Sequence, residues 1–161
     1  MDYVHVLEDV DILADLSFDH LKKIAEIGEI KTYQGTEIIF KENTTSNELY
    51  IILQGMVEIL MDPSVISSDK SSPGLKTIAT LRRGESFGEV ALVDQGLRSA
   101  SAMCVQDNTQ LLVLPAKEFN DLCQSNFEVG FVVMRNIAAD LAFKLRQTDI
   151  GMREQIVWGK K

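Results

Sequence analysis

Three features of the sequence predict a mainly β domain with flanking helices. About seven short strand-like runs, separated by turn-forming residues, occupy the middle of the chain. A helical pattern precedes these runs, and a longer helical pattern follows them. Many short strands with regular turns are typical of closed or nearly closed β folds. We therefore expect a double-stranded β-helix, a jelly-roll-like barrel of about eight strands, between an N-terminal helix and C-terminal helices.

The N-terminal segment, residues 1–28, carries one amphipathic helical pattern between Val10 and Ile27. Its apolar residues recur at helical spacing: Leu13, Leu16, Leu21, Ile24 and Ile27. Ser17 is placed as an N-cap, and Asp19 falls in the first turn, where a negative charge is favourable. This segment is predicted to form a short helix that packs on the β core.

The central segment, residues 29–115, is predicted to be the β core. Its strand-like runs are Glu29 to Tyr33, Glu37 to Lys41, Glu48 to Leu53, Met56 to Met61, Leu75 to Leu81, Arg98 to Gln106 and Thr109 to Leu114. Gln54 and Gly55 separate two of these runs, and glycine readily adopts positive φ. The pair is predicted to form a tight hairpin turn.

The C-terminal segment, residues 116–161, is predicted to be helical, first over Ala116 to Gln124 and then from Phe127 to about Trp158. The longer helix carries an apolar stripe, interrupted at Thr148 and Asp149, that consists of Val133, Ile137, Leu141, Leu145, Met152 and Ile156. A helix of this length usually extends past one small domain. We therefore expect a lid over a ligand and a homodimer through this helix.

Composition excludes several classes of function. The formal net charge of −8 opposes nucleic-acid binding, which needs clustered lysine and arginine. No apolar stretch reaches the length of a membrane span, so we expect a cytoplasmic protein without one. His5 and His20 lie apart from any group with metal-ligand spacing, and we expect no metal and no cofactor. Cys104 and Cys123 are expected to be buried thiols.

One stretch between two strand patterns carries the chemistry of an anion site. Gly88 frees the backbone for close approach, and the four residues from Glu89 to Leu92 suffice for one helical turn. Nine residues after Glu89, Arg98 returns to the same region and offers a bidentate guanidinium to two phosphate oxygens. The carboxylate of Glu89 then accepts a hydrogen bond from a hydroxyl. An anion site beside a hydroxyl acceptor describes a nucleotide site.

This stretch resembles the phosphate-binding cassette of the cyclic nucleotide-binding domain family, which includes bacterial catabolite activator-like sensors. The resemblance rests on two runs: Phe87, Gly88, Glu89, Val90, Ala91 and Leu92, followed by Arg98, Ser99 and Ala100. It extends over roughly residues 10–150, with Glu48 to Leu53 and Gly55 as supporting matches. We expect such a sensor here without a DNA-binding domain.

The resemblance implies a role for each cassette residue. Glu89 would accept from the ribose 2′-hydroxyl, Arg98 and Ser99 would hold the cyclic phosphate, and amides around Gly88 would complete the shell. Serine at position 99 favours cyclic AMP over cyclic GMP, because family members with threonine there often prefer cyclic GMP. The base is expected to meet the C-terminal helix, where four residues are candidates and the choice stays open: Phe143, Arg146, Thr148 and Asp149.

The sequence therefore predicts a sensor that is not an enzyme. Ligand binding is expected to move the C-terminal helix and to signal to a dimer interface or to an unidentified protein effector. A phosphodiesterase-like enzyme is disfavoured, because the sequence shows no metal cluster and no placed general base. The alternative is a docking or scaffold module that keeps the fold without binding a ligand.

Overall fold

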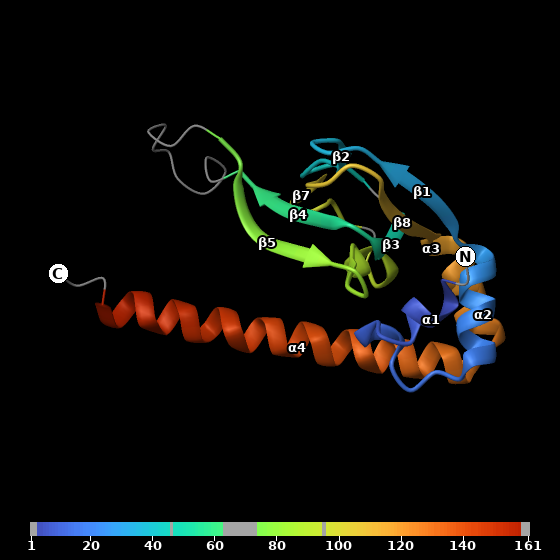
Figure 1. Ribbon diagram of the computed structural model, residues 1–161. Coiled ribbons are helices and arrows are strands. Elements are labelled where there is room, and N and C mark those ends of the chain that lie inside the picture. Colours follow the sequence, from blue (N-terminus) through green and yellow to red (C-terminus); the bar gives the residue numbers. More distant parts are fainter. Residues whose placement is uncertain (1–2, 46, 63–73, 95, 159–161) are drawn as a thin grey trace.

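Two antiparallel sheets of four strands face each other in the computed structural model (Figure 1). One has the order β1-β8-β3-β6 and the other the order β2-β7-β4-β5. The strands are β1 Glu29–Tyr33, β2 Ile38–Phe40, β3 Glu48–Gln54, β4 Met56–Met61, β5 Lys76–Arg82, β6 Ser86–Phe87, β7 Ser101–Cys104 and β8 Thr109–Pro115. The structure describes residues 3–45, 47–62, 74–94 and 96–158, and no side chains at 91, 148, 149 and 151–158.

The strand β3 is apolar on both faces because it separates two hydrophobic layers. Its residues alternate between the faces, as in any strand. Tyr50 and Ile52 belong to the cluster between the sheets, together with Phe87 of β6. Leu49 and Ile51 belong to the larger cluster under the helices. A run of five buried residues in one strand therefore follows from its central position.

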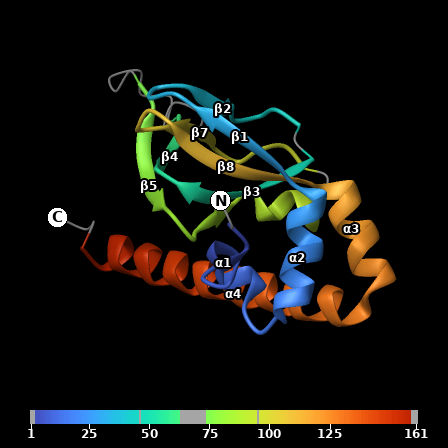
Figure 2. The same cartoon turned by 45° about the vertical axis from the view of Figure 1, so that its right-hand side comes forward.

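The helices cover the outer face of the sheet that contains β3, as Figure 2 shows. They are α1 Val4–Leu7, the 3₁₀ helix η1 Asp11–Leu13, α2 Phe18–Ile27, α3 Ala116–Ser125 and α4 Phe127–Trp158. The predicted cap of α2 is confirmed, since the Ser17 hydroxyl accepts from the backbone N–H of His20 at 3.3 Å. Phe119 of α3 is fully buried, so this helix is firmly packed on the sheet.

The first half of α4 is anchored against the N-terminal segment. Val129, Val133 and Ile137 are buried along one face at successive helical turns. The side chain of Asn136 donates to the carbonyl of Ala14 at 2.9 Å. The second half of α4 continues past the sheets in Figure 1. These contacts anchor the first half of the helix to the N-terminal segment.

The predicted jelly-roll-like fold with flanking helices is confirmed, although the sheets are not closed into a barrel. Each sheet has two edge strands. Among the described strands, every strand neighbour lies in the same sheet, so the two sheets stay separate. The chain changes sheet at several corners instead. Over the described residues, no helix is long and apolar enough to cross a membrane.

Three local predictions were wrong. Gly55 has the predicted positive φ of 94°, but β3 and β4 lie in different sheets, so the turn is a corner and not a hairpin. The pattern from Val10 to Ile27 is not one helix, because η1 and α2 are separate elements and Ala14 between them is non-helical. The strand predicted from Arg98 begins only at Ser101.

Candidate functional site

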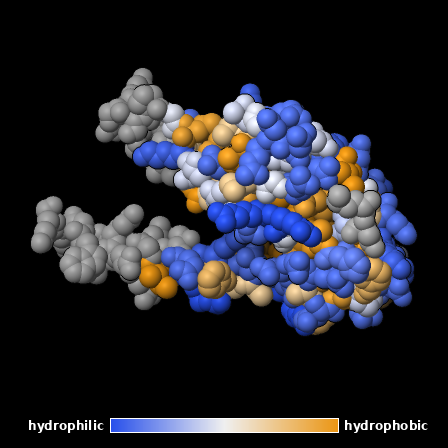
Figure 3. Space-filling model, in the orientation of Figure 1, coloured by the Kyte–Doolittle hydropathy of each residue, from blue (hydrophilic) through white to orange (hydrophobic). Residues whose placement is uncertain are grey.

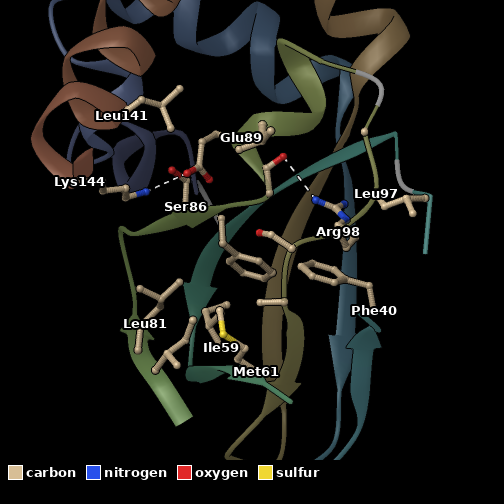
Figure 4. A pocket seen from close by; sticks show the side chains of 18 of the residues that line it. Phe40, Ile59, Met61, Leu81, Ser86, Glu89, Leu97, Arg98, Leu141 and Lys144 are labelled. Carbon is tan, nitrogen blue, oxygen red and sulfur yellow. Dashed lines mark hydrogen bonds and ion pairs between the residues drawn. The ribbon is translucent and has the colours of Figure 1, made fainter. Parts of the chain in front are cut away.

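A cavity of about 570 Å³ opens beside the cassette (Figure 4), within the range that small-molecule sites occupy. Its apolar side is formed by Phe40, Ile59 and Leu81, from β2, β4 and β5. Its polar side includes Glu89 and Arg98. The cavity thus combines an apolar wall with a charged end, which suits a ligand that has a flat apolar part and an anionic part.

The predicted helical turn of the cassette is present as the 3₁₀ helix η3, Glu89–Leu92. It follows β6 through Gly88, whose φ of 82° lies in the left-handed region. A Cβ atom at Gly88 would lie 2.5 Å from Nη1 of Arg98 and 3.1 Å from the carbonyl oxygen of Glu48. Glycine is therefore required here both by the backbone conformation and by the close approach of Arg98.

The guanidinium of Arg98 is held at the edge of the cavity. Its Nη2 donates to the carbonyl of Glu48 at 2.8 Å, and its Nη1 donates to the carbonyl of Gly88 at 3.4 Å. It also lies over the ring of Phe40, at 4.1 Å from the centroid. Burial lowers the pKa of Arg98 from its ordinary value, while the interaction with Tyr50 and the carboxylates of Glu48 and Glu89 oppose this shift. The guanidinium stays positively charged, and its contacts fix its orientation.

Three aromatic rings support this guanidinium. Tyr50 and Phe87 are stacked at 5.0 Å with an interplanar angle of 7°, and Phe40 lies 5.6 Å from Tyr50. The Tyr50 hydroxyl donates to a carboxylate oxygen of Glu48 at 2.5 Å. Burial, together with this hydrogen bond, raises the pKa of Tyr50, so the phenol stays protonated. The rings form a rigid floor under the cation.

The carboxylate of Glu89 points into the cavity and meets a lysine from α4. Nζ of Lys144 lies 2.8 Å from Oε1 of Glu89 (Figure 4). The same Nζ lies 2.7 Å from Oδ2 of Asp140. Burial disfavours the ammonium, but the bonds to Asp140 and Glu89 outweigh it and raise the pKa of Lys144. Lys144 was not predicted from the sequence. Its only sequence signal is its place one helical turn after Leu141 and Asp140.

Most cassette residues come together as the sequence predicted. Phe87, Gly88, Glu89, Val90, Arg98, Ser99 and Ala100 all line the cavity. Leu92 instead belongs to the hydrophobic cluster under the helices, where it fixes η3 to the core. The side chain of Ala91 lies outside the described part of the chain.

Of the four candidates for base contact, the two whose side chains the structure describes do not line the cavity. Phe143 is 55% exposed and Arg146 is also exposed, and neither is among the residues that line the cavity. Thr148 and Asp149 lie within α4, but their side chains are outside the described part of the structure. The described α4 residues that line the cavity are Leu141 and Lys144.

Two relatives are similar to most of this chain in sequence. The cyclic AMP receptor protein of Thermus thermophilus is 32% identical over 120 residues, which are 74% of this chain and 50% of that protein. The cGMP-dependent protein kinase, isozyme 1, of Drosophila melanogaster is 29% identical over 125 residues, which are 75% of this chain and 16% of the kinase. The chain thus spans half or less of the length of these relatives.

Solved structures and a family model agree with the observed fold. The catabolite activator protein of Thermus thermophilus has a TM-score of 0.75 at 28% identity and covers 89% of this chain, which spans 62% of that chain. A cyclic nucleotide-binding domain of Methylobacillus flagellatus has a TM-score of 0.76 at 20% identity, over 95% of this chain and 82% of that chain. Residues 30–126, more than half of the chain, match the model for the cyclic nucleotide-binding domain. The chain therefore belongs to the cyclic nucleotide-binding domain family.

Proposed function

We propose that this protein is a cyclic AMP sensor in which Arg98 and Ser99 hold the cyclic phosphate and Glu89 accepts from the ribose 2′-hydroxyl. One observation carries the proposal: Glu89 and Arg98, each 8% exposed, converge on one cavity of suitable size. Two buried charges of opposite sign at one cavity are suited to the two polar ends of one ligand.

The proposed binding mode uses the geometry of the cavity. The guanidinium is already fixed by two carbonyls and an aromatic ring, so little side-chain entropy is lost when it meets a phosphate. The apolar wall that contains Ile59 and Leu81 offers a surface for the base. Ser99 follows Arg98 directly in the chain and also lines the cavity, so we assign its hydroxyl as a further donor to the phosphate.

The preference for cyclic AMP is supported by two observations. Serine stands at position 99, where family members with threonine often favour cyclic GMP. The similar receptor protein of Thermus thermophilus is named for cyclic AMP. The similar kinases are named for cyclic GMP. The relative affinity for the two ligands is therefore the first quantity to be measured.

The proposed output needs no catalysis by this chain and passes through α4. Phe143, Leu145 and Ile150 are 55%, 63% and 51% exposed, and Figure 3 shows hydrophobic atoms on the described end of this helix. We place a homodimer contact or an effector protein on this surface, because exposed apolar groups of this size are usually covered. Light scattering is expected to give the mass of a dimer; a monomer at micromolar concentration would leave an effector protein as the partner.

Titration calorimetry of the nucleotide-free protein tests the proposal. Cyclic AMP, cyclic GMP and 5′-AMP are titrated in parallel, because the last has the same base but an open phosphate. We expect cyclic AMP to bind most tightly and 5′-AMP much more weakly, since the cassette closes around a singly charged cyclic phosphate. Absence of binding by all three would instead favour the docking module.

A further inference from the structure

The backbone of Arg98 lies outside the regular sheets, because β7 begins only at Ser101. Its N–H donates to the carbonyl of Thr44 at 2.9 Å, and its carbonyl accepts from the backbone N–H of Asn43 at 2.8 Å. Both partners belong to the segment that follows β2, residues 41–45. This segment, and not a strand ladder, therefore holds the backbone from which the guanidinium extends.

The same segment also holds the chain on either side of Arg98. Before it, Leu97 forms an isolated antiparallel bridge with Thr45. After it, the hydroxyl of Ser101 accepts from the backbone N–H of Glu42 at 2.9 Å. A shift of residues 41–45 would therefore move the base of the Arg98 side chain relative to the cavity.

The turn of this segment depends on the backbone of Asn43. Its φ of 63° lies in the left-handed region, which asparagine tolerates better than most residues other than glycine. Its side chain is exposed, so the residue adds little to core packing. A β-branched residue disfavours this φ, and a change to negative φ would turn the backbone N–H of position 43 away from the carbonyl of Arg98.

We infer that Asn43 is a positioning residue for Arg98, because its left-handed backbone holds the main chain of Arg98 where the guanidinium can meet the phosphate. This inference rests on the proposed function and adds a residue that does not line the cavity. The carbonyls of Glu48 and Gly88 orient the end of the arginine side chain, while residues 43 and 44 fix its backbone. A bidentate contact depends on geometry, so it needs both ends in place.

The experiment compares Asn43→Val with the matched control Asn108→Val. Asn108 lies in the turn between β7 and β8, is exposed, has a φ of 58° and does not line the cavity. Urea unfolding is expected to show a similar loss of stability in both variants, because the backbone strain is alike. Titration calorimetry is expected to show an affinity for cyclic AMP about fivefold lower in Asn43→Val and unchanged in Asn108→Val.

Two further variants at position 43 keep the comparison decisive. Asn43→Gly adopts positive φ without strain, so we expect it to bind cyclic AMP as tightly as the parent. If valine prevents folding, Asn43→Ala is compared with Asn108→Ala, since alanine is strained at positive φ but has no branched side chain. A glycine variant that binds as weakly as Asn43→Val would mean that the asparagine side chain acts, and not the backbone conformation.

The Arg98→Ala background separates positioning from a general disturbance of the cavity. Without a guanidinium there is nothing for Asn43 to position, so adding Asn43→Val is expected to lower the affinity no further. An equal loss of affinity in the parent and in the Arg98→Ala background would show that Asn43 acts through the shape of the cavity, and would refute the positioning role.

Hydrogen exchange tests the backbone contact without any ligand. The amide of Arg98 donates to Thr44, so nuclear magnetic resonance is expected to show slow exchange in the parent and in Asn108→Val but faster exchange in Asn43→Val. If the parent binds no cyclic nucleotide, the proposed function fails, and slow exchange in Asn43→Val would separately overturn the role of Asn43. If the parent binds cyclic AMP and Asn43→Val binds it equally tightly, the proposed function stands and the positioning role is refuted.

Discussion

Replacing Arg98 with alanine is expected to lower the affinity for cyclic AMP about a hundredfold, or on the order of 3 kcal/mol. The phosphate would then lie in a cavity without the guanidinium that pairs with it. Arg98→Lys keeps the charge but loses the planar fork, so we expect an intermediate loss of about tenfold. Calorimetric titration of each variant measures both effects.

Arg98 also has a structural role, which the controls must separate from binding. Its guanidinium bonds to the carbonyls of Glu48 and Gly88, so alanine also leaves these two acceptors without their donor. Thermal unfolding therefore accompanies each titration, and Arg83→Ala serves as an exposed arginine control. If Arg98→Ala stays folded and binds cyclic AMP as tightly as the parent, Arg98 does not hold the phosphate.

Most strands could be predicted from sequence because each is defined locally, but the short β6, Ser86–Phe87, was not predicted. The alternation of side chains and the turn residues at each end gave β1 and β4 with their observed limits. Which strands pair with one another could not be predicted from local sequence. Gly55 adopts positive φ both in a hairpin and in a corner between sheets, and the choice between them depends on distant pairing such as that of Val57 with Cys104.

The site also combines residues that are close in sequence with a residue that is distant in sequence. Gly88, Glu89 and Arg98 lie within eleven consecutive residues, so their proximity follows from one short turn. Lys144 reaches Glu89 because the packing of α4 against the N-terminal segment fixes the position of α4 along its helix axis. The apolar stripe of α4 shows which face is buried, but it does not show which residue of that face lies opposite the cassette.

Gly88→Ala is expected to impair both folding and binding, through two separable causes. At a φ of 82°, a Cβ atom adds strain that lowers the free energy of unfolding by about 1 kcal/mol. The same Cβ would lie 2.5 Å from Nη1 of Arg98, so the guanidinium must move away from its place. We therefore expect affinity for cyclic AMP to fall at least about tenfold, as for a misplaced bidentate partner.

Gly84→Ala is the matched control for this variant. Gly84 has a φ of 85°, almost the same as Gly88, but a Cβ there would meet Asp9 only at an ordinary 3.5 Å. Urea unfolding is expected to show a similar loss of stability in both variants from backbone strain. Titration is expected to show weakened binding in Gly88→Ala alone. Equal affinities in the two variants would mean that the contact between position 88 and Arg98 does not set the phosphate site, because strain is common to both and only the displacement of the guanidinium differs.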